Sequence, residues 1–130
     1  MTRLSSFKRQ AHDHFEPQDD SDPAAQRRLR GQLEQIDWTA FASNREVIGA
    51  VLGQADAAKF QRIAVAAAHA RAMWVKAALT MTETTSGLDP RQTRQLTELR
   101  ENYEELTEVY EAMRRMVERG YLTYSGPHGG

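Results

Sequence analysis

Two segments decide the fold: DAAKFQRIAVAAAHARAMWVKAALTMTET (residues 56–84) and DPRQTRQLTELRENYEELTEVYEAMRRMVERG (residues 89–120). In both, apolar side chains recur at alternating spacings of three and four, which is the period of one face of an α-helix. We call this face the seam; it comprises Phe60, Ile63, Ala67, Ala70, Trp74, Ala77 and Met81 in the first segment and Leu96, Leu99, Tyr103, Leu106, Tyr110, Met113 and Val117 in the second. The sequence therefore predicts two long amphipathic helices.

The residues at the ends of these segments are typical helix caps. Asp56 and Asp89 can accept hydrogen bonds from the unpaired backbone N–H groups of a helix start, and Pro90 suits the first helical position. Gly120 is placed to end the second helix, because glycine adopts the left-handed conformation found there at little cost. These signals bound the two helices at both ends.

The link between the two helices determines how they pack. The helices are expected over about 56–84 and 90–119, so a turn of about five residues joins them. Such a short link forces the second helix to fold back on the first. We expect an antiparallel helical hairpin with a coiled-coil-like seam.

Upstream, the sequence predicts two shorter N-terminal helices. The first runs over about 23–36, and the second runs over 45–52 and ends at Gly53. Three residues are expected to cap or begin these segments: Asp22 before the first helix, Asp37 before a short turn, and Asn44 before the second helix. The apolar side chains of this part are Leu29, Leu33 and Ile36, then Trp38 and Phe41, then Val47, Ile48, Val51 and Leu52. The predicted fold class is all-α, a helical bundle built on the long hairpin.

The two ends of the chain differ from its middle. Residues 1–21 are polar, charged and aperiodic, and we expect a flexible polar arm there. Residues 22–120 are expected to form a single helical domain, followed by a C-terminal tail over 121–130. Within the tail, the stretch 121–124 alternates apolar and polar residues but is too short to predict a sheet. The arm and this stretch are candidates for ordering on a partner.

The long helix after Asp56 has more apolar surface than one neighbour can cover. Besides the seam it carries a second strip, which consists of Ala64, Ala68, Ala72, Val75 and Leu79. Either the N-terminal helices pack on this strip or another copy of the chain does. Because burial is hard to complete in so small a chain, we expect a homodimer.

The composition excludes several classes of protein. Seventeen basic and eighteen acidic residues give a formal charge of −1, so no overall charge indicates binding to nucleic acid or to an anionic membrane. The absence of cysteine excludes a disulfide scaffold, a thiolate zinc site and thiol catalysis. The longest purely apolar run, residues 64–68, is far shorter than the roughly 20 residues of a membrane span. We expect a cytoplasmic protein.

No motif predicts catalysis, a cofactor or a metal site. The chain has no glycine-rich phosphate loop, dinucleotide fingerprint or nucleophile elbow. A di-iron centre would need glutamates that are each followed by a histidine three residues later. No glutamate in this sequence has a histidine at that position. His12 and His14 could bind a metal adventitiously, because no rigid frame holds them. Because His69 lies on a polar helix face, a phosphotransfer module remains an alternative. Because several arginines could bind an anionic small molecule, a small all-α enzyme is another.

The leading functional interpretation is a small non-enzymatic helical adaptor or regulatory protein that acts through protein–protein contacts. Its candidate partner-binding residues are exposed ones that flank the hairpin: His69, Lys76, Arg62, Glu101, Glu105 and Glu108. The alternative is a subunit of a nucleoprotein assembly whose nucleic-acid-binding residues are Arg27, Arg28 and Arg30. These three arginines lie early in a helix, where cations oppose the helix dipole, so the dipole does not explain them.

Overall fold

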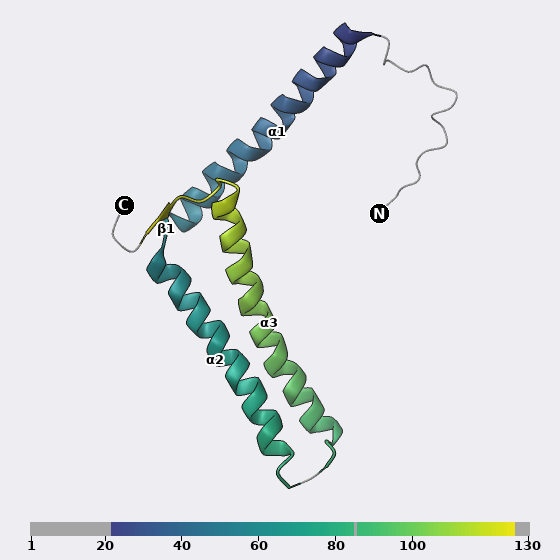
Figure 1. Ribbon diagram of the computed structural model, residues 1–130, viewed down its shortest axis with the longest axis vertical. Helices are drawn as coiled ribbons and strands as arrows, with labels where there is room; N and C mark the ends of the chain where they lie inside the picture. The colour runs from purple at the N-terminus through teal and green to yellow at the C-terminus, as the bar shows by residue number, and fades with distance from the viewer. Residues whose placement is uncertain (1–21, 85, 127–130) are drawn as a thin grey trace, which may run out of the picture. The chain divides into compact units, whose positions relative to one another are not determined.

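The computed structural model describes residues 22–84 and 86–126, and in this part the chain is all-α apart from two very short strands (Figure 1). The described helices are α1 (Pro23–Leu52), α2 (Ala57–Met81) and α3 (Pro90–Glu118), and the strands are β1 (Ala55–Asp56) and β2 (Tyr124–Ser125). The predicted arm over 1–21, with His12 and His14, lies outside the described residues, as do the last four residues of the tail. The chain divides into two compact units, Met1–Ala40 and Phe41–Gly130, and each is described by itself.

The prediction of two short N-terminal helices is wrong, because α1 is one continuous helix of 30 residues. Asp37 and Asn44 lie within it and cap nothing. The physical reason is that the stretch between the two expected helices contains no proline or glycine to interrupt the backbone hydrogen bonds. A threonine in the same stretch fits the helix as well, since Thr39 donates its hydroxyl to the carbonyl of Gln35 one turn earlier at 2.9 Å.

The predicted caps of all three helices are confirmed. Asp22 accepts hydrogen bonds from the backbone of Ala24 and Ala25 at 3.1 and 3.2 Å. Asp56 accepts one from Lys59 N at 2.8 Å. Asp89 and Gln92 form a reciprocal capping box, in which each side chain accepts from the other residue's backbone N–H. α2 ends at Met81, about three residues earlier than predicted.

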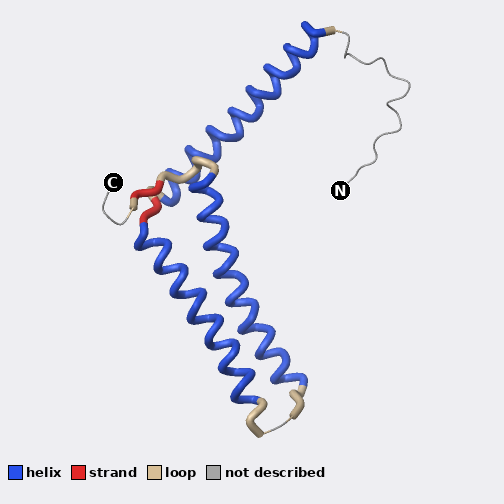
Figure 2. Tube along the Cα trace, in the orientation of Figure 1, coloured by secondary structure: helices blue, strands red, loops and turns tan. Residues whose placement is uncertain are grey.

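α2 and α3 pack side by side along the seam (Figures 1 and 2). Two ring contacts join them: Phe60 meets Tyr110 edge-on with centroids 5.5 Å apart, and Trp74 stacks on Tyr103 at 6.0 Å with 18° between the rings. Every seam residue is half-buried, whereas the neighbouring positions on both helices are mostly exposed.

At the end of the α2–α3 pair opposite the α2–α3 turn, β1, β2 and the residues between Gly120 and β2 form a small closing structure, which we call the cap (Figure 2). After Gly120, whose φ of 80° is left-handed, the chain turns back and Tyr124–Ser125 pairs in parallel with Ala55–Asp56. The pairing includes a hydrogen bond from Ala55 N to the Thr123 carbonyl at 2.8 Å. Ala55 and Leu122 are the two buried residues of the described chain, at 1% and 3% exposure. The stretch 121–124 is therefore held by this chain's own residues.

The C-terminal end of α1, which belongs to the same compact unit, also contacts this cap. Phe41 packs against Tyr121 with ring centroids 5.7 Å apart, and the Arg45 guanidinium donates to the Gly120 carbonyl. Ile48 lines a hollow together with Met116 of α3. The apolar surface near the end of α3 thus receives its extra cover from residues 41–48.

Candidate partner-binding surfaces

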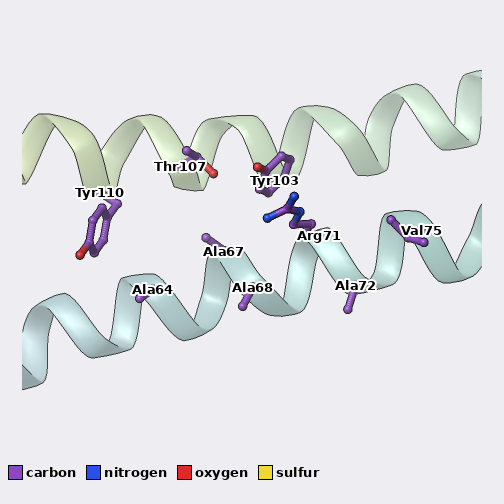
Figure 3. A pocket seen from close by; sticks show the side chains of 9 residues that line it. All are labelled: Ala64, Ala67, Ala68, Arg71, Ala72, Val75, Tyr103, Thr107 and Tyr110. Carbon is purple, nitrogen blue, oxygen red and sulfur yellow. The ribbon is translucent and has the colours of Figure 1, made fainter.

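Four residues of the second apolar strip of α2 lie exposed and form the floor of a shallow groove beside α3: Ala64, Ala68, Ala72 and Val75 (Figure 3). The groove has a volume of about 430 Å³. Its lining from α2 is Ala64, Ala67, Ala68, Arg71, Ala72 and Val75, and its lining from α3 is Tyr103, Thr107 and Tyr110. Within the unit that holds α2, the groove is lined by α2 and α3 alone, and Val75 and Leu79 of the strip remain 47% and 64% exposed.

The shape of the groove follows from the side chains that build it. The α2 side presents mainly alanines, which extend only a methyl group from the helix, whereas Tyr103 and Tyr110 rise from α3 as large walls. Both tyrosines are half-buried because each also contacts a seam ring of α2. The result is a smooth apolar trough along one helix with an aromatic rim along the other.

One charged group lies inside this apolar trough. The Arg71 guanidinium carbon is 5.6 Å from the centroid of the Tyr103 ring, in cation–π geometry. Trp74 stacks on the same tyrosine, so α2 contributes two of the groups that hold the Tyr103 ring. Arg71 remains exposed, and its guanidinium keeps donors for a carboxylate. The groove therefore combines apolar contact along its length with one fixed positive charge.

The residues that the sequence predicts to bind a partner lie outside this groove. Arg62, His69 and Lys76 are exposed and recur every seven residues along one face of α2, away from the groove. Arg62 and His69 line the same hollow of about 630 Å³, which is formed by α2 alone. Lys76 lines a different hollow, between α2 and Leu99 of α3. The structure thus brings two of the three together.

The glutamates of α3 are exposed but lie apart from these basic residues. At 100° per residue, Glu101, Glu105 and Glu108 are about 140–160° around α3 from Tyr103, which faces the groove. No ion pair in the described part of the chain joins them to the α2 cations. The ion pair found on this helix is Arg100 with Glu104 at 3.8 Å, and both side chains are about half exposed, so it adds little stability.

Arg27, Arg28 and Arg30 are exposed on the first two turns of α1, within the N-terminal unit. They do not share one face, since Arg28 lies about 160° around the helix from Arg30. The first turn of α1 contains no acidic residue. A phosphate backbone following one side of α1 would therefore meet two of the three arginines.

The groove could not be predicted from the sequence, for a structural reason. Arg71 of α2 and Thr107 of α3 are not seam residues. Only the pairing of the two helices shows that both line the same groove. A signal was present, because the second strip already marked this side of α2 as apolar. What the strip lacked was any information on which α3 side chains stand beside it.

The described residues supply neither a metal site nor a membrane span. No group of three histidine, aspartate or glutamate side chains gathers in residues 22–84 and 86–126 closely enough to hold a metal ion. No helix in those ranges combines the length and the apolar composition that crossing a bilayer demands.

The chain was compared with protein-family models, with curated proteins and with solved structures, and none of the three comparisons found a match.

Proposed function

We propose that this chain is a small cytoplasmic, non-enzymatic helical adaptor or regulatory protein that acts through protein–protein contacts and works as a homodimer. In this proposal α2 and α3 form an antiparallel hairpin with a coiled-coil-like seam, and the groove along that hairpin receives a helix of the partner protein. The observation that carries the proposal is the exposed apolar strip of α2 beside the tyrosine rim of α3.

The amount of exposed apolar surface supports this role. Only Ala55 and Leu122 of the described residues are buried, whereas many large apolar side chains are more than one-third exposed. Contiguous apolar surface of this kind marks interaction sites in proteins that are stable alone. A groove lined with alanine also lets a partner helix approach closely, and Tyr103 and Tyr110 supply the rigid aromatic contacts that dominate binding energy at interfaces.

The charge of Arg71 in the groove restricts which partner helices can bind there. Arg71 lies at the middle of the trough, so a partner helix with an apolar face and one carboxylate near its centre fits best. Burying Arg71 under a purely apolar helix would leave its charge without a partner, which is costly. The groove thus favours an acidic amphipathic helix.

Two further faces belong to the proposal. Arg62 and His69 share a hollow on α2, and Glu101, Glu105 and Glu108 line the far face of α3. We propose that these exposed charged residues, together with Lys76, set orientation and partner choice, as charges at the rim of an interface do.

Photo-crosslinking distinguishes these faces. A photoreactive amino acid is placed at Ala68 in the groove, at His69, or at Glu105, with Thr84 in the α2–α3 turn as the matched control. The proposal expects a discrete adduct with a different protein from Ala68, and its loss when Arg71→Glu is added. Adducts equally strong from Thr84, or none from any position in native extract, contradict the proposal.

The nucleic-acid alternative rests on the exposed arginines of α1. It predicts binding to RNA or DNA that weakens steeply with salt and that Arg27→Glu and Arg30→Glu both reduce. Fluorescence anisotropy with single-stranded RNA, single-stranded DNA and duplex DNA at two salt concentrations measures this. No binding at low salt removes the alternative.

A further inference from the structure

Residues 25–40 of α1 carry an apolar stripe that the proposed groove does not use. Leu29, Leu33 and Ile36 follow one another at spacings of four and three, and their side chains are 54%, 50% and 62% exposed. Ala25 and Ala40 continue the same line at both ends. This is one continuous face about four turns long on a helix without a break.

The spacing of Leu29, Leu33, Ile36 and Ala40 is that of the core positions in a two-stranded coiled coil. Leu33 occupies heptad position a, and Leu29 and Ile36 occupy position d. The residues that flank the core on one side, at position e, are then Arg30 and Asp37. Both are exposed, and neither forms an ion pair within the described residues. The flanking residues on the other side, Gln32 and Thr39, carry no charge.

We propose that two copies of the chain associate through this stripe as an antiparallel helix pair, with Leu33 of one copy against Ile36 of the other. In an antiparallel pair, each flanking position faces the same kind of position on the other helix. Arg30 then faces Asp37 of the second copy, and because the contact is two-fold symmetric, this ion pair forms twice. The inference rests on the homodimer of the proposed function and adds the surface, direction and register.

The charges select this register among those that align the apolar residues. Shifting one helix by seven residues in one direction sets Arg30 against Arg30 of the other copy. Shifting it by seven in the other direction sets Asp37 against Asp37. Like charges held opposite each other weaken association, so only the register centred between Leu33 and Ile36 is favourable. A parallel pair would place Asp37 against the neutral Gln32 and gain no ion pair.

Charge reversal in the full chain tests the pairing. Sedimentation equilibrium across micromolar concentrations gives the dimer dissociation constant for the wild type, Arg30→Glu, Asp37→Arg and the double variant. Each single variant sets two pairs of like charges opposite one another, so we expect dimerisation to weaken about tenfold at low salt. The double variant restores two opposite-charge pairs and is expected to recover wild-type affinity within about threefold.

Arg27→Glu is the matched control, because it makes the same change of charge about 150° around the helix from the stripe. It should leave the dissociation constant unchanged, while circular dichroism at a concentration where every variant is dimeric shows equal helix content. Equal weakening by Arg27→Glu and Arg30→Glu would overturn the inference, as would failure of the double variant to recover affinity.

Helix direction is tested with spin labels, which the absence of native cysteine makes simple. In the proposed register Arg28 lies level with residue 41 of the second copy, so labels on Arg28→Cys are offset by about 20 Å along the axis. A parallel pair would hold the labels side by side. Labels at that shorter separation overturn the proposed direction.

The failures are distinguishable. A monomer at every concentration overturns this inference and the homodimer, while the crosslinks from Ala68 still test the adaptor role. A dimer that Arg30→Glu leaves intact and Leu79→Asp weakens places the interface on α2, and overturns the α1 inference alone.

Discussion

Residues 23–40 of α1 and the α2–α3 pair carry the same kind of apolar stripe, but within the described residues only the stripe of the pair is half-buried. Phe60 and Trp74 are half-buried against rings of α3, whereas Leu33 and Ile36 are at least half exposed. The difference lies in the neighbours and not in the pattern. Periodicity shows that a helix has an apolar face, and it does not show whether the same chain supplies the cover.

The first prediction concerns hydrogen exchange in the two regions. Backbone amides in the middle of α2 and α3 should exchange only when the pair opens, whereas those of 25–36 should exchange through local unfolding, since a lone helix of this length is marginal in water. In dilute protein we expect protection at least about 100-fold lower in 25–36. Exchange measured by mass spectrometry gives the ratio. Equal protection at concentrations where the chain is monomeric would contradict the comparison.

The second prediction compares one leucine from each region. Leu122→Ala removes a side chain that is 3% exposed and leaves a cavity, so we expect a loss of about 2–3 kcal/mol in the free energy of unfolding. Leu33→Ala, the same chemical change on a half-exposed stripe, should cost less than about 0.5 kcal/mol in dilute protein. Urea unfolding followed by circular dichroism measures both. Similar losses for the two would show that the α1 stripe is covered within the monomer.

Helix ends were more predictable from the sequence than the middle of the molecule. Asp22, Asp56 and Asp89 were identified as caps because capping is a local interaction between a side chain and the next turn. The same reasoning failed at Asp37 and Asn44, since a residue that can cap a helix is also tolerated inside one when nothing interrupts the backbone. Capping residues therefore mark helix starts most clearly when a proline follows, as after Asp22 and Asp89.

The features that sequence reasoning missed are non-local. β1 and β2 are two residues each, and the stretch 121–124, which overlaps β2, is too short to predict a sheet. The strands form because Gly120 turns the chain back and Leu122 becomes buried. The contact of Arg71 with Tyr103 likewise depends on which α3 side chain stands beside α2. Neither has a signal within a few residues of sequence.

The third prediction uses the caps to compare the regions again. Asp89→Ala removes one partner of the capping box, and we expect a loss of about 1 kcal/mol in the free energy of unfolding, because α3 packs against α2 along its length. Asp22→Ala removes the same chemistry from α1 but should only fray the first turn. Urea unfolding measures the first effect, and exchange of the amides of residues 24–26 measures the second. A global loss from Asp22→Ala would mean that the start of α1 unfolds together with α3.

The last prediction isolates the contact that joins α2 to α3 at the groove. A double-mutant cycle of Trp74→Ala and Tyr103→Ala should give a coupling free energy of about 0.5–1.5 kcal/mol, since the two rings stack at 6.0 Å. A second cycle, Trp74→Ala with Tyr121→Ala, is the control, because Tyr121 packs on Phe41 at the cap and should be additive with Trp74. Urea unfolding of all the variants supplies both coupling energies. Coupling in both cycles would show that the substitutions act through a change of the whole unit, which contradicts the prediction. Coupling in the first cycle alone would show that the Trp74–Tyr103 contact itself stabilises the wall of the groove.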